Sequence, residues 1–139
     1  MSFEEILANV REQAGALRTT LRLDRPGEDF PVVAEALAAG ARSIAADPLP
    51  QRRLATVGWL MEHRRPLVQP DCAAADPPPP PELIEAYGVR AQMLGPVLAG
   101  GEVAGWISVH AAEPREWSEA DVDALLGAVA AVERELAGG

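Results

Sequence analysis

The sequence predicts an α+β fold in which one helix at each end of the chain flanks a group of β-strands. Near each terminus, apolar residues recur at helical spacing and form a stripe on one side only. Between these segments, three stretches alternate side chains with the period of two that a half-buried strand requires. Ala99-Gly100-Gly101 joins the last two stretches, which indicates an antiparallel hairpin.

Capping boxes mark the start of both terminal helices. Ser2 is followed by Glu5, and Ser118 by Asp121, so each pair can satisfy exposed backbone amides at a helix N-terminus. Both helices are long and one-sided, so they can pack on the same sheet. Their stripes are Phe3, Ile6, Leu7, Val10 and Ala14 in the first helix, and Val122, Leu125, Leu126, Val129, Val132 and Leu136 in the second.

The three strands are expected at residues 17–23, 89–97 and 102–110. In the first, leucines alternate with Arg18, Thr20 and Arg22. In the hairpin, one face is small and aliphatic, which suits packing against helices. The other face carries Arg90, Gln92, Leu94, Pro96, Trp106, Ser108 and His110.

The region between the first strand and the hairpin has weaker patterns. Residues 30–37 are rich in Ala and Glu and have helical propensity, but their short length and the following Gly40 leave a strand open. Residues 50–63 predict a helix, because Leu54, Val57 and Met61 share one face behind an initial proline.

Two further short elements are expected before the hairpin. Residues 66–69 are a strand candidate, and the five prolines at 77–81 must be extended and act as a spacer. Residues 81–87 allow one or two helical turns that Gly88 stops.

Composition excludes several classes of function. The chain has 12 basic and 21 acidic residues, and all the basic residues are Arg. Without Lys there is no Schiff base and no phosphate loop ending in Gly-Lys-Ser/Thr. The net charge of −9 argues against binding to nucleic acid or to an anionic membrane.

Cysteine usage and the chain termini bound the remaining possibilities. One Cys excludes an internal disulfide and a zinc site built from Cys pairs. The acidic, amphipathic start does not resemble a secretory signal. We therefore expect a cytoplasmic protein with a single domain over residues 1–139, and no metal ion or cofactor.

The element order and three motifs resemble the GAF domain family over residues 3–137. Residues 93–110 read M-L-G-P-V-L-A-G-G-E-V-A-G-W-I-S-V-H, a strand with a Pro that leads through a Gly turn into a second strand. The helix entry at 115–126 and the segment Val68-Gln-Pro-Asp71 also match the family pattern. The resemblance implies a GAF/PAS-like antiparallel central sheet with the terminal helices on one face and a ligand pocket on the other. It also implies a homodimer formed through the terminal helices.

The sequence departs from the motifs of three subtypes of this family. Cyclic-nucleotide-binding members carry an Asn-Lys motif, and this chain has no Lys. Bilin-binding members attach the pigment to a Cys that is typically followed by His, whereas Cys72 is followed by Ala73. Free methionine sulfoxide reductases need a second, resolving Cys.

The candidate ligand-binding residues come from the pocket side of the predicted sheet and from nearby loops. His110 either hydrogen-bonds a ligand or lies open to water at a strand end. Arg18, Arg22 and Arg90 predict an anionic ligand group such as a carboxylate, unless they pair with surface Glu. The aromatic residues with a polar edge suit either a cleft or the core. The full set is Arg90, Gln92, Trp106, Ser108, His110, Trp59, Asp71, Cys72 and Tyr87.

The favoured function is small-molecule binding by a sensor or regulatory protein, with recognition rather than catalysis. Arg90 or a neighbour would pair with an anionic group, Gln92 and Ser108 would orient the ligand, and Trp106 would cover it. Two alternatives stay open. One is a small-metabolite enzyme that uses Cys72, Asp71 or His110, which requires an activated thiol. The other is a dimerisation module without a ligand.

Overall fold

The computed structural model describes residues 1–138. Five strands form one antiparallel sheet in the order β2-β1-β5-β4-β3. The expected α+β fold with an antiparallel sheet is confirmed. The strands are β1 (Arg18–Leu23), β2 (Val32–Leu37), β3 (Leu67–Gln69), β4 (Ala91–Ala99) and β5 (Glu102–Ala111).

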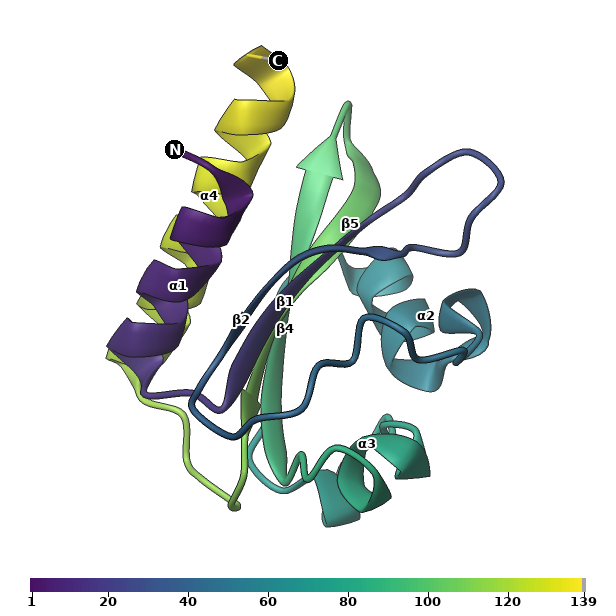
Figure 1. Cartoon of the computed structure of the whole chain (residues 1–139). Coiled ribbons are helices and arrows are strands. Elements are labelled where there is room, and N and C mark those ends of the chain that lie inside the picture. The colour runs from purple at the N-terminus through teal and green to yellow at the C-terminus, as the bar shows by residue number, and fades with distance from the viewer. Residues whose placement is uncertain (139) are drawn as a thin grey trace.

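Helices cover both faces of the sheet. The terminal helices α1 (Phe3–Ala14) and α4 (Glu119–Gly138) pack side by side on one face (Figure 1). The short helices α2 (Ala55–His63) and α3 (Pro81–Glu85) lie on the other face, together with the long connection that follows β2 (Figure 1). Because only short helices and a connecting segment cover the face opposite α1 and α4, a site can form on that face.

Both predicted capping boxes are formed. Ser2 Oγ accepts from the Glu5 amide at 3.1 Å, and the Ser2 amide donates to Glu5 Oε1 at 3.2 Å. At α4, the Asp121 amide donates to Ser118 Oγ at 3.1 Å, and the Ser118 amide donates to Asp121 Oδ2 at 2.9 Å. The two helices that anchor the sheet therefore begin where the sequence places them.

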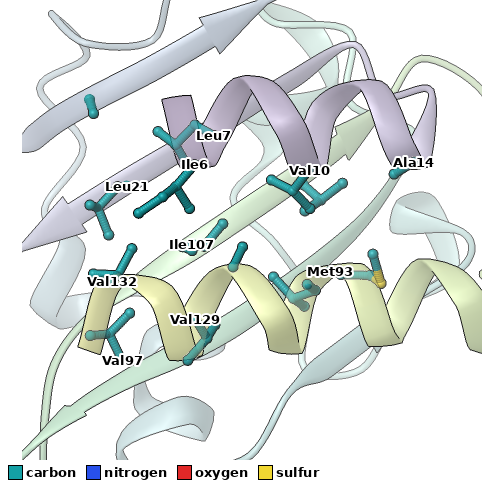
Figure 2. Packing of buried hydrophobic residues seen from close by; sticks show 14 of the residues in the cluster. Ile6, Leu7, Val10, Ala14, Leu21, Met93, Val97, Ile107, Val129 and Val132 are labelled. Carbon is teal, nitrogen blue, oxygen red and sulfur yellow. The ribbon is translucent and has the colours of Figure 1, made fainter. Parts of the chain in front are cut away.

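The main hydrophobic core lies between the sheet and the terminal helices (Figure 2). A Cβ added at Gly95 would lie 2.9 Å from atoms of Leu125 and Val129, so this glycine lets β4 approach α4 closely. Figure 2 shows α1 and α4 contributing Ile6, Leu7, Val10, Ala14, Val129 and Val132, and the strands contributing Leu21, Met93, Val97 and Ile107.

A smaller hydrophobic cluster lies on the opposite face of the sheet. Phe30 and Trp106 are in contact there, with ring centroids 4.8 Å apart. Val57 and Leu60 of α2 pack onto this cluster and hold the helix against the sheet. No helix within residues 1–138 is both long and apolar enough to span a membrane.

Two segments in the middle of the chain needed the structure to define them. Of the two possibilities open for residues 30–37, the strand is correct, because β2 pairs along the edge with β1 despite its helical propensity. The helix expected over residues 50–63 is interrupted at Leu54, whose ψ of 138° is extended. A 3₁₀ turn (Gln51–Arg53) precedes this break and α2 follows it.

Candidate ligand-binding site

Four buried polar residues form one row across the face opposite α1 and α4. The antiparallel registers place Arg18 of β1 opposite His110 of β5, His110 opposite Gln92 of β4, and Gln92 opposite Gln69 of β3. All four side chains are at most 3% exposed. Such a row is costly to bury unless its polar atoms find partners.

Hydrogen bonds fix the orientation of the two glutamines. The carbonyl of Pro77 can only accept, and Gln69 Nε2 donates to it at 2.6 Å. Gln69 therefore turns its oxygen toward Gln92, whose Nε2 donates to it at 2.9 Å. The remaining Gln92 atom, Oε1, is buried and has no hydrogen-bond partner among residues 1–138.

The contact with Arg18 determines which ring nitrogen of His110 carries the proton. Arg18 Nη1 lies 3.1 Å from His110 Nδ1, and a guanidinium only donates, so Nδ1 accepts and the ring proton is on Nε2. Burial, together with the charges of Arg18 and Arg22, lowers the pKa of His110 to about 3. His110 is therefore a neutral N–H donor at physiological pH.

Two guanidinium groups are buried on this face without a carboxylate in contact. Arg18 is 0% and Arg22 is 7% exposed. Arg18 Nε donates to the carbonyl of Arg42 at 2.8 Å, and Arg22 Nη1 donates to that of Phe30 at 2.9 Å. Burial lowers the pKa of both groups. In the part of the chain that the structure describes, neither side chain has a carboxylate at ion-pair distance.

Acidic residues act on these cations only from farther away. Glu35 favours the charged form of Arg18, and Asp47 does the same for Arg22. Both carboxylates are already engaged: Glu35 with Ser43 and the Ile44 amide, and Asp47 with the Leu49 amide. The positive charge of the two guanidinium groups is thus only partly compensated.

A cavity of about 40 Å³ lies between this sheet face and the segments that cover it. The sheet contributes Arg22, Gln92, Leu94, Trp106, Ser108 and His110. The covering segments contribute Ile44, Asp47, Leu49, Gln51, Leu54, Thr56, Val57, Pro80, Leu83 and Tyr87. The space is enough for one to a few water molecules. A larger guest requires the covering segments to move.

Comparison with known proteins assigns the family. A family model described as "GAF domain" matches residues 2–136. The chain belongs to the GAF domain family. The resemblance seen in the sequence is therefore confirmed. No curated protein matches the chain.

Solved structures share the fold of this GAF domain. The cyanobacteriochrome TePixJ GAF domain aligns with a TM-score of 0.78 and 23% identity, covering 96% of this chain and 86% of that one. The PixJ GAF domain of Thermosynechococcus elongatus in its blue-light absorbing form gives 0.76 and 24%, covering 96% and 84%. The chromophore-binding domain of an unusual bacteriophytochrome from R. palustris gives 0.77 and 18%, covering 96% and 53%.

Five of the nine sequence-predicted site residues line the cavity of this GAF domain. Tyr87 comes from the segment after α3, and the other four come from the strands: Gln92, Trp106, Ser108 and His110. The alternation of β4 and β5 placed these strand residues on the face that carries the cavity. Arg22, which the sequence offered as part of an Arg cluster, joins them.

The other four predicted residues lie outside the cavity lining. Arg90 alternates in step with Gln92, but it precedes β4 at the end of the sheet and its side chain is exposed. Trp59 stacks on His63 on α2, with ring centroids 4.1 Å apart. Asp71 accepts from the Ala73 amide at 3.1 Å and caps a short turn.

Cys72 is buried, and its environment opposes reactivity. Burial first, and then the charge of Asp71, raise the pKa of the Cys72 thiol to about 11. A catalytic thiol requires the opposite shift. The structure does not bring Cys72 and Asp71 to the cavity that His110 lines.

Some site residues escaped the sequence-based prediction. Thr20 shares the alternation of Arg18 and Arg22, which was a usable signal. Gln69 lies in a strand of three residues, too short for alternation to indicate a face. The covering residues Ile44, Asp47 and Leu49, which precede the predicted helix, follow no periodic pattern.

Proposed function

We propose that this GAF domain is a sensor module that binds a small organic molecule with a carboxylate group in the cavity beside Arg22 and His110. The observation that carries the proposal is the pair of buried guanidinium groups, Arg18 and Arg22, without a contacting carboxylate. Buried charges in proteins are normally paired. A bound carboxylate would supply the missing partner.

The cavity offers a suitable environment for both parts of such a ligand. Arg22 lines the cavity, and Arg18 lies behind the neutral ring of His110. Both charges act on His110, which indicates that the space around this ring is electropositive. Leu94, Val57 and Trp106 give the apolar wall that a hydrocarbon body requires.

Binding requires the cover of the cavity to yield. A cavity of about 150 Å³ is known to hold benzene, whereas this one measures about 40 Å³. The movable parts are the connection from β2 to α2 and the segment of α3, since both cover the sheet without belonging to it (Figure 1). A ligand-driven shift of these segments would be the signal of the sensor.

Structural relatives support a sensory role. One similar structure is the chromophore-binding domain of a bacteriophytochrome. Another is a domain of a putative two-component sensor histidine kinase from Sinorhizobium meliloti 1021, with a TM-score of 0.70 and 13% identity, covering 96% of this chain and 87% of that one. We carry over to this chain only the two general roles that these names state, which are binding of a small molecule and sensing.

Matched acids and amides test the proposal. Isovalerate and its homologues should bind, while the corresponding primary amides should bind at least about tenfold more weakly. Only the acids carry the negative charge that can pair with the Arg22 guanidinium. Calorimetric titration and the ligand-induced rise in melting temperature measure both. Binding of the amides as tight as that of the acids would contradict the proposal.

Two arginine substitutions provide the matched pair. Arg22→Met should weaken acid binding by about tenfold or more, because it removes a buried cation from the cavity wall. Arg90→Met should leave binding unchanged, since that side chain is exposed outside the cavity. The reverse order would move the anion site to the sheet end.

We also propose a homodimer formed through α1 and α4. The supporting feature is a groove of about 620 Å³ between the outer sides of these helices. Its α4 wall consists mainly of small residues: Ala120, Ala124, Gly127, Ala128 and Ala131. A cytoplasmic location stays a prediction from the sequence.

A further inference from the structure

Three buried polar atoms on the pocket face have no hydrogen-bond partner within residues 1–138. They are Arg18 Nη2, Thr20 Oγ1 and Gln92 Oε1. Arg18 and Gln92 flank His110 on the two neighbouring strands, and Thr20 is opposite Ser108 in the next row. Elsewhere in the described chain, buried side-chain polar atoms have partners. Of these three residues only Gln92 lines the cavity, so its Oε1 is the unpartnered atom that a bound ligand can serve.

The polar groups that line the cavity differ in character between β4 and the other two strands. The guanidinium of Arg22 on β1 can only donate, and the Nε2–H of His110 on β5 also donates. Gln92 Oε1 can only accept, and its orientation is fixed through Gln69 by the carbonyl of Pro77. Reversing the Gln92 amide would bring two amide oxygens together. The site thus offers donors on β1 and β5 and an acceptor on β4.

A plain carboxylate does not complement this arrangement. Its oxygens would satisfy the donors, but they would leave Gln92 Oε1 unpaired and place negative charge near another acceptor. A buried acceptor without a donor is destabilising. A ligand with a donor next to its carboxylate would satisfy both sides.

We propose that the ligand of this GAF domain combines its carboxylate with a neutral O–H or N–H donor that pairs with Gln92 Oε1, so that hydroxy acids are the smallest members of its ligand class. The inference rests on the proposed function. The donor is neutral because the guanidinium groups of Arg18 and Arg22 would repel an ammonium group. Hydroxy acids should therefore bind more tightly than both plain acids and amino acids.

Four acids on one carbon skeleton test the inference with the wild-type protein. Titration calorimetry would compare isovalerate, 2-hydroxyisovalerate, 3-hydroxyisovalerate and valine, with acids of three to six carbons to allow for size. One of the hydroxy acids should bind about tenfold more tightly than the plain acid, and valine more weakly than the hydroxy acid. The advantage is modest because water can serve Gln92 when the plain acid is bound.

Two glutamine variants locate the donor contact. Gln92→Leu removes the acceptor, so this variant should bind the hydroxy acid and the plain acid with about equal affinity. Gln51→Leu is the control, because Gln51 also lines the cavity but its Nε2 donates to Leu49 in the cover. This variant should keep the preference. A preference that survives in Gln92→Leu, or disappears in Gln51→Leu, overturns the assignment.

The outcomes separate this inference from the function on which it rests. Equal binding of plain and hydroxy acids, both weakened in Arg22→Met, would refute the donor inference and leave carboxylate binding intact. Absence of binding by every acid in the series would refute both. The wild-type panel decides the matter even if Gln92→Leu does not fold, which its melting curve would reveal.

Discussion

At the scale of single residues, the pair of Arg18 and His110 explains how a charged side chain is held inside this protein. Arg18 is 0% exposed, and its guanidinium donates to His110 Nδ1 and to the carbonyl of Arg42. Both acceptors are neutral, so neither of them offsets the positive charge of the Arg18 guanidinium. The arrangement requires an unprotonated His110, because an imidazolium has no acceptor to offer.

This requirement predicts that acid destabilises the protein through His110. The pKa of His110 is about 3 in the folded protein against 6.5 for an ordinary histidine, so its contribution to stability is complete above pH 6.5 and is lost as the pH falls toward 3. From about pH 7 to about pH 5.5 the loss amounts to about 1 kcal/mol. Urea unfolding at the two pH values measures it.

The two histidines of the chain provide the comparison. His110→Gln keeps an acceptor for Arg18 but cannot be protonated. Between about pH 7 and about pH 5.5, the free energy of unfolding of this variant should therefore fall by about 1 kcal/mol less than that of wild type. His63→Gln, on the surface, should behave like wild type. A wild-type slope in His110→Gln would show that His110 is not the group responsible.

Alternation in the sequence predicted which residues share a face, but not how they pair. It placed Gln92, Ser108 and His110 on the pocket side because a strand period of two is strict. It gave Arg90 the same weight, since parity does not reveal where the sheet ends. The registers that align Arg18 with His110, and His110 with Gln92, arise from contacts between distant strands and have no signature in any one segment.

At the scale of elements, one side chain joins the two parts of the cover. Tyr87, which follows α3, has the guanidinium of Arg42 4.9 Å and that of Arg18 5.8 Å from its ring centre. The nearby carboxylate of Asp47 raises the pKa of the Tyr87 phenol. The ring therefore connects α3 with the sheet and with the segment between β2 and α2.

Removal of this ring should loosen the cover. In Tyr87→Ala, amide hydrogen exchange across residues 42–54 should be several-fold faster than in wild type, because the two cation–π contacts of the ring are lost. Tyr87→Phe keeps the ring and should lie between the two. Equal exchange in Tyr87→Ala and wild type would mean that other contacts hold the cover.

The elements that position the site differ in how well the sequence defines them. The hairpin of β4 and β5 and the helices α1 and α4 carry long periodic patterns and explicit caps, so their places were predictable. The edge strand β2 has Ala- and Glu-rich residues, and only its pairing with β1 makes it a strand. The connection between β2 and α2 has no periodic pattern, and its conformation depends on contacts such as that of Arg42 with the carbonyl of Ala86.

At the scale of the whole molecule, charge is distributed unevenly between surface and interior. The net charge is −9, yet Arg18 and Arg22 lie inside, so the exposed surface is more acidic than the composition alone suggests. Such a surface repels anions at long range, and salt screens this repulsion. The carboxylate affinity of the cavity must therefore come from contacts inside it rather than from the overall field.

The opposite face of the molecule predicts self-association. If α1 and α4 form the dimer interface, light scattering should give twice the chain mass of 14.7 kDa. Ala131→Glu places a charge in the groove of small residues and should return the mass to that of one chain, because burying an unpaired carboxylate is costly. Ala137→Glu, exposed on α4 outside the groove, should remain a dimer. A wild-type mass of 14.7 kDa at every concentration would refute the dimer, and a dimer that survives Ala131→Glu would place its interface elsewhere.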